Sequence, residues 1–160
     1  MYKFLGFVLL ISYVAVMNAL QTDEQRAMQA FFEGKRAVNR AAHAAAQQID
    51  PLKLTEGIVS IDPLRAEAAA LSYLRSNLKL DAAGEPLADS YWRAGMDVVV
   101  FDIVNETATF PYTYTNAAYG YSVTLNRPAV VLMIRLRYPR LFRVVSPIEW
   151  TVKGVAELVY

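Results

Sequence analysis

Residues 4–20 read FLGFVLLISYVAVMNAL, a run of seventeen residues without a charged side chain. At the helical rise of about 1.5 Å per residue this run spans roughly 26 Å, close to the hydrocarbon thickness of a bilayer, about 30 Å. We therefore expect a single membrane-spanning helix over residues 4–20. The remaining residues then form the part of the chain that this helix anchors.

Charged residues on either side of the apolar run predict its orientation. Lys3 precedes it, and Asp23 and Glu24 lie after it. Because basic residues favour the cytoplasmic side, we expect residues 1–3 in the cytoplasm and the C-terminal domain outside it, held by one pass through the cell membrane. A cleaved signal peptide is an alternative, but a cut after Ala19 would place Met17 where a small residue is needed.

The apolar run continues into a second helical segment. Residues 21–49 contain no proline and one glycine, and they are rich in helix-forming Ala, Gln, Glu, Arg and Met. We expect residues 21–50 to continue the anchor as one amphipathic helix. Small side chains on one face allow close approach of another backbone. This face is a candidate assembly interface, with packing on the chain's own sheet as the alternative; it comprises Ala27, Phe31, Gly34, Ala37, Val38, Ala41 and Ala45.

Two Asp-Pro pairs divide the next part of the chain. The pair at residues 50–51 ends the long helix, because proline disfavours helical backbone in the residue before it. The pair at residues 62–63 begins another helix, predicted over residues 63–78, with an aspartate cap before a proline in the first turn. We expect the residues between the pairs to form a connection and residues 81–90 a loop. The predicted apolar face of the second helix consists of Leu64, Ala68, Leu71 and Leu74 or Leu78.

From Tyr91 onward the period of apolar residues changes to two, as in β-strands. Four strands are predicted, at residues 96–105, 119–126, 129–138 and 148–160. Alternation of apolar and polar side chains favours an antiparallel sheet with one buried face. We therefore expect an α+β fold in which a long N-terminal helix, half transmembrane and half exposed, and a second helix pack on a roughly four-stranded antiparallel sheet. Residues 51–160 form the extracytoplasmic domain in this interpretation.

Composition excludes several kinds of chemistry. Sixteen basic and fifteen acidic side chains leave a net charge of +1, so we expect no nucleic-acid partner. The chain has no cysteine and one histidine, which excludes disulfides, thiolate sites and multi-histidine metal sites. We expect no cofactor and no metal.

No catalytic constellation is recognisable. His43 lies in an alanine-rich helix, where we expect a surface or packing role rather than a place in a catalytic triad. Asp97 and Asp102 are an odd number of positions apart in a predicted strand, so they should project from opposite faces. Phosphate-binding loops, dinucleotide fingerprints and nucleophile elbows are absent from the sequence. We expect neither enzyme activity nor a small-molecule substrate.

Four tyrosines surround a predicted hairpin loop whose tip is Asn116: Tyr112, Tyr114, Tyr119 and Tyr121. Exposed tyrosines offer a large contact area with a polar end, so these residues are candidates for contact with a protein or glycan partner. Cross-strand packing is the alternative. The nearby Asn105-Glu106-Thr107 also fits the short glycosylation sequon.

The chain resembles the TadE/TadG-like pseudopilins of tight-adherence (Flp-type) pilus systems in three stretches. The first is the N-terminal hydrophobic segment that runs into a charged helix. The second is KRAVNRAAHAAAQ at residues 35–47, similar to a family stretch with an Asn-Ala pair, an aspartate and several alanines; His43 stands where the aspartate is usual. The third is an alternating strand followed by PRLF at residues 139–142 and a last strand over residues 150–160.

This resemblance implies an exported, membrane-anchored, pilin-like structural component of a pilus or secretion apparatus, present at the cell surface or in a filament. Such a protein has no active site and assembles with other pilin-like subunits or with copies of itself. The chain lacks the Gly-Glu pair that prepilin peptidases cut, since Phe7 comes directly after Gly6. The alternative function is a single-pass anchored binding module for a protein or glycan partner.

Overall fold

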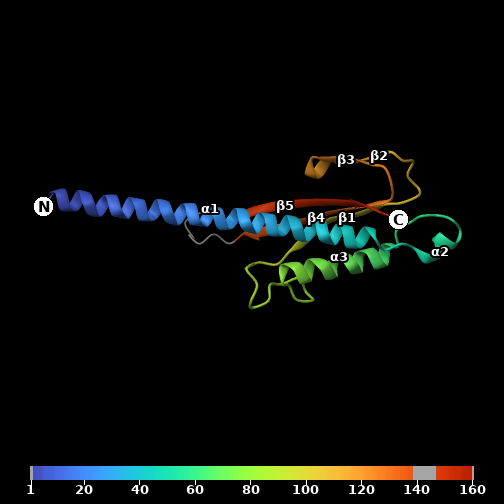
Figure 1. Cartoon of the computed structure of the whole chain (residues 1–160), viewed down its shortest axis with the longest axis horizontal. Helices are drawn as coiled ribbons and strands as arrows, with labels where there is room; N and C mark the ends of the chain where they lie inside the picture. Colours follow the sequence, from blue (N-terminus) through green and yellow to red (C-terminus); the bar gives the residue numbers. More distant parts are fainter. Residues whose placement is uncertain (1, 139–146, 160) are drawn as a thin grey trace.

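The computed structural model describes residues 2–138 and 147–159, and it confirms the α+β class. The elements in chain order are α1 (Tyr2–Ala46), α2 (Pro51–Thr55), α3 (Pro63–Leu78), β1 (Asp97–Val104), β2 (Tyr112–Asn116), the 3₁₀ turn η1 (Ala117–Tyr119), β3 (Tyr121–Leu125), β4 (Ala129–Tyr138) and β5 (Ile148–Glu157). In Figure 1 the first half of α1 projects alone from one end of the molecule, and the second half lies along the strands. The predicted continuation of the apolar helix is therefore present.

Both Asp-Pro pairs begin helices. The Asp62 carboxylate accepts hydrogen bonds from the backbone N–H groups of Leu64 and Arg65, at 3.0 and 3.1 Å, and begins α3 as predicted. Asp50 caps Leu52 and Lys53 in the same way. The prediction that the first pair ends the long helix is wrong, because α1 already ends at Ala46 and Asp50-Pro51 begins the five-residue helix α2 within the predicted connection.

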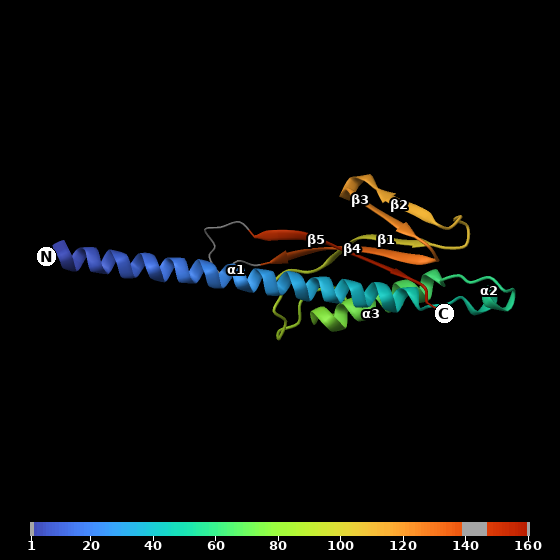
Figure 2. The ribbon, with the colours of Figure 1, turned by 45° about the horizontal axis from the view of Figure 1, so that its top comes forward.

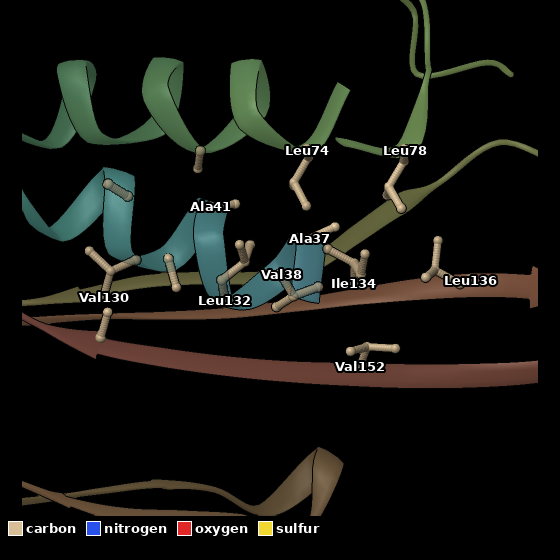
Figure 3. Packing of buried hydrophobic residues seen from close by; sticks show 14 of the residues in the cluster. Ala37, Val38, Ala41, Leu74, Leu78, Val130, Leu132, Ile134, Leu136 and Val152 are labelled. Atoms are coloured by element: carbon tan, nitrogen blue, oxygen red, sulfur yellow. The ribbon is translucent and has the colours of Figure 1, made fainter. Parts of the chain in front are cut away.

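The buried face of α3 differs from the predicted one. It consists of Ala66, Ala70, Leu74 and Leu78, whereas Leu64 is 81% exposed. The alanines of this face let α3 lie close to the alanine-rich half of α1, so the neighbouring helix selects the face. In Figure 3, α1 is packed between α3 and the strands β4 and β5, with Val38 and Ala41 in the interior.

The strands form two antiparallel sheets. One sheet has the order β1-β4-β5, and the other is the hairpin β2-β3. The chain thus has five strands in two sheets among its described residues, where we expected about four strands in one. Residues 126–128 connect β3 to β4, which belong to different sheets. Residues 139–142 of the family resemblance lie outside the described residues.

Strand β4 is buried on both faces, which corrects the expectation of a sheet with one buried face. Its residues Val130, Leu132 and Ile134 belong to the core beneath α1 and α3. The alternate residues Val131 and Met133 belong to a second core, which the β2-β3 hairpin covers. Figure 2 shows the helices on one side of the three-stranded sheet and the hairpin on the other.

Candidate membrane anchor and its junction with the domain

The first half of α1 exposes a continuous apolar surface. Phe4, Leu9 and Tyr13 are 74%, 63% and 64% exposed, and no residue of the range 2–20 is buried. Within the described part of the chain, α1 is the helix that is long and apolar enough to cross a membrane. An apolar surface of this extent is unfavourable in water, so lipid or another protein must cover it.

Two hydroxyl groups of this region are satisfied within the helix itself. Ser12 Oγ donates to the carbonyl oxygen of Val8 at 2.9 Å, and Thr22 Oγ1 donates to that of Asn18 at 2.8 Å. Where water is absent, a serine or threonine hydroxyl in a helix can donate its hydrogen bond to the backbone carbonyl four residues earlier. The hydroxyls of Ser12 and Thr22 therefore need no water molecule as a hydrogen-bond partner.

The first acidic residue after the apolar run is hidden rather than exposed. Asp23 is 2% exposed, and the Tyr138 hydroxyl at the end of β4 donates to its carboxylate at 3.1 Å. Burial, with the adjoining Tyr91 hydroxyl and the Asp23 carboxylate, raises the pKa of Tyr138. The phenol consequently keeps its proton and its role as a donor. This bond ties the end of the anchor to the sheet.

Aromatic rings surround this bond. Tyr138 stacks on Tyr91, with ring centroids 6.1 Å apart, and lies 5.9 Å from Trp150. Trp150 in turn meets Phe31 of α1 edge to face at 5.6 Å. We call these four residues the junction aromatics. Tyrosine and tryptophan favour the interface between membrane and water, where one end of the side chain is apolar and the other polar.

The predicted assembly interface on α1 faces the protein's own domain. Ala27, Ala37, Val38, Ala41 and Ala45 are at most 4% exposed, and Gly34 is buried too. These residues are covered by α3 and the strands. They therefore pack inside the chain's own domain, which is the alternative to an assembly interface.

Two glycines show how close this packing is. A Cβ atom on Gly34 would lie 2.5 Å from Leu136 Cδ1, and one on Gly154 would lie 2.6 Å from Val38 Cγ1. The seventh predicted interface residue, Phe31, is half-buried against Trp150. The free side of α1 beyond the anchor instead presents Met28 and Phe32, which are 51% and 53% exposed.

Three of the four candidate tyrosines pack the hairpin onto the main sheet. Tyr114 is 8% exposed, and its hydroxyl donates to Asp102, while burial and this contact raise the pKa of Tyr114. Tyr119 and Tyr121 are half-buried in the same core. Lys153 Nζ binds the Tyr119 carbonyl oxygen at 2.6 Å and lies 5.3 Å from the Tyr121 ring centroid. Among the four, Tyr112 keeps the greatest exposure, at 38%.

The expected opposition of Asp97 and Asp102 is wrong because β1 contains a bulge between Val98 and Val100. Their partners on β4 are Arg135 and Val131, an even number of residues apart, so both carboxylates project from one face. The separation of these partners is nevertheless roughly 13 Å, too long for a shared catalytic proton. His43 is exposed on α1. Among residues 2–138 and 147–159, no group of three acidic or histidine side chains is arranged to hold a metal ion.

The sequon asparagine has a structural role that its sequence does not reveal. Asn105 Oδ1 accepts from the backbone N–H of Ile61, and Asn105 Nδ2 donates to the Ile61 carbonyl oxygen, both at 2.9 Å. Next to it, Glu106 forms an ion pair with Lys53 of α2. A glycan on Nδ2 would break this pairing, so the end of β1 is fastened to the α2 region rather than presented for modification.

No family model matches the chain, and neither a curated protein nor a solved structure is significantly similar to it. The resemblance to TadE/TadG-like pseudopilins therefore stays a prediction.

Proposed function

We propose that the chain is a membrane-anchored, pilin-like structural subunit of a pilus or secretion apparatus, without catalytic activity. One observation carries this proposal: α1 is a single 45-residue helix. Its first half is apolar and exposed, and its second half packs against α3 and the strands of an α+β domain. Such a helix holds a folded domain at a defined height above a membrane and leaves its apolar half available to lipid and to neighbouring subunits.

The junction supports membrane insertion of residues 4–20. Asp23 lies about 4.5 Å along the helix axis beyond residue 20, within the polar headgroup layer of a bilayer. The carboxylate is hidden under Tyr138, and the junction aromatics lie beside the next turns of α1. In this position they would form the aromatic layer that commonly borders a membrane span.

Assembly through α1 would use its free side. Met28 and Phe32 are one helical turn apart and are exposed apolar side chains on this side of α1, separated from the anchor by the polar residues 21–26. The small-residue face cannot serve as this contact in the folded subunit, because the domain covers it. Copies of the chain, or other pilin-like subunits, would therefore meet along residues 2–32.

Crosslinking tests this proposal cleanly because the natural chain has no cysteine. We expect the variants Ala15→Cys and Met28→Cys to form disulfide-linked dimers on mild oxidation in native membranes. The matched control Ser72→Cys, exposed on α3, should stay monomeric. Dimer yields at positions 15 and 28 no higher than at position 72 would contradict assembly through α1.

The same control variant tests topology. A maleimide that does not cross membranes should label Ser72→Cys in intact cells if residues 51–160 lie outside the cytoplasm. Labelling only after the cells are opened would contradict the proposed orientation, whatever the crosslinking result.

A further inference from the structure

Strand β1 is an edge of the three-stranded sheet. Within the described residues it pairs with β4 alone, so one side of its backbone has no strand partner. Natural edge strands are usually protected by charged side chains, proline, a bulge or a covering element. The sequence of β1 is DVVVFDIV, which contains no lysine or proline, and Val98 is 38% exposed. The bulge of β1 lies between Val98 and Val100, and from Phe101 to Val104 the strand keeps a regular register with β4. This regular part of the edge is suited to accept another strand.

A small apolar hollow lies beside this edge, between α3 and β1. Its volume is about 50 Å³. Leu71, Leu74 and Ala70 of α3 line one wall, and Val98, Phe101 and Leu132 line the sheet side. This α3–β1 hollow is far below the roughly 300 Å³ of a typical small-molecule pocket, but it can take the end of one aliphatic side chain.

One acidic group borders the hollow. Glu67 is exposed on α3 and lines the α3–β1 hollow. Its carboxylate forms no ion pair within the described part of the chain. A basic side chain entering beside an aliphatic one would meet this carboxylate. The charge of the rim therefore selects for lysine or arginine next to the inserted residue.

We infer that the β1 edge and the α3–β1 hollow form a groove for an extended segment of a protein partner. The segment adds a strand to β1, inserts one aliphatic side chain into the hollow and places a lysine or arginine near Glu67. Strand addition supplies affinity through backbone hydrogen bonds, and a pocket for alternate side chains supplies specificity. This groove lies apart from α1; the choice of a separate segment over a second copy rests on the proposed membrane anchoring, and the groove itself does not.

A second copy of the chain fits this edge less well than a separate segment does. The strands of the main sheet run alongside α1 in both views (Figures 1 and 2). Symmetric pairing of two β1 edges would be antiparallel and would reverse one molecule relative to the other. The two anchors would then point in opposite directions, which two copies in one membrane cannot satisfy.

The test uses the full chain in detergent micelles and a library of random octapeptides displayed on phage. We expect enriched peptides to carry an aliphatic residue next to lysine or arginine. The most enriched peptide, made synthetically, should slow hydrogen exchange in β1 when it binds. Leu71→Asp should weaken this binding about tenfold or more, because it places a charge in the hollow. Leu64→Asp, on an exposed part of α3 outside the hollow, should leave binding unchanged.

A charge exchange keeps the inference falsifiable if Leu71→Asp unfolds. Glu67→Lys changes an exposed residue and should weaken the selected peptide severalfold, while a peptide with its basic residue replaced by glutamate should regain affinity for this variant. The inference is overturned if no peptide is enriched over empty micelles, if Glu67→Lys leaves affinity unchanged, or if slowed exchange maps away from β1. Self-association of the full chain through β1 would assign the edge to a second copy and also overturn it.

Discussion

The two halves of α1 have the same backbone conformation and opposite patterns of burial. Residues 2–20 expose leucine, phenylalanine and valine, whereas residues 27–46 bury mainly alanine. In a water-soluble helix the largest apolar side chains would be the ones covered. In this helix the half that carries small side chains is packed against the domain, and the half that carries large apolar ones is left uncovered. Small side chains allow helix and sheet to approach, and large ones are left for another environment.

The largest expected effect comes from placing a charge in the packed half. Val38 is 0% exposed between α3 and the strands, so Val38→Asp should lower the free energy of unfolding by about 4 kcal/mol or more. Chemical denaturation followed by tryptophan fluorescence measures this loss. Arg36→Asp, on an exposed neighbouring position, is the matched control and should change stability little.

The same charge in the exposed half should leave the domain intact. Leu10 is 59% exposed and contacts no part of the domain, so Leu10→Asp should not change the unfolding transition. It should instead oppose membrane insertion by about 3 kcal/mol, which is measured as release of the chain from membranes by alkaline extraction. If the Leu10→Asp variant stays fully in the membrane fraction, the exposed half of α1 does not act as a membrane anchor and the proposed difference in function between the two halves is wrong.

The junction between the halves should show a smaller effect. Tyr138→Phe removes the hydroxyl that donates to the buried Asp23 carboxylate and should cost about 1.5 kcal/mol of stability. Tyr112→Phe, at an exposed tyrosine of the hairpin, provides the control. If both variants unfold alike, the Asp23–Tyr138 bond contributes nothing to holding the anchor on the sheet.

The finest comparison uses one glycine from each half. Alanine favours a helix over glycine by up to about 1 kcal/mol, but a Cβ on Gly34 meets Leu136, which is 2% exposed and confined by its neighbours. Gly34→Ala should therefore destabilise the domain by about 1 kcal/mol net. A Cβ on Gly6 would meet nothing within 4 Å, so Gly6→Ala should cost nothing. Differential denaturation of the two variants would resolve this difference.

Local signals predict much of the fold. The Asp62-Pro63 pair marks the start of α3, and the alternating run at Ala129–Tyr138 matches the bounds of β4. A helix cap and the alternation of a strand each depend on residues that are close together in the sequence, so both can be recognised without knowledge of the fold. The continuous helix α1 is predictable for the same reason, since no proline interrupts it.

Features decided by distant residues are not predictable from the pattern. The bulge at Val98–Val100 lies in a run of valines, where neither face is distinguished by polarity, so the register shift has no local signal. Strand β2 alternates tyrosine with threonine, a pattern that also suits the hairpin loop predicted there. The buried face of α3 depends on the alanines of α1, and the small-residue face of α1 is equally compatible with an internal or an external surface.

The close contact of α1 with β4 and β5 has a mechanical consequence. Between the anchor and Ala46 the helix has no proline, and its one glycine there, Gly34, is held against Leu136. A pulling force on the anchor is therefore transmitted along a continuous rod with no hinge. Because the strands lie alongside this rod, the load reaches the sheet as shear spread over many side-chain contacts. A domain mounted in this way resists tension on its anchor without first unravelling from one end.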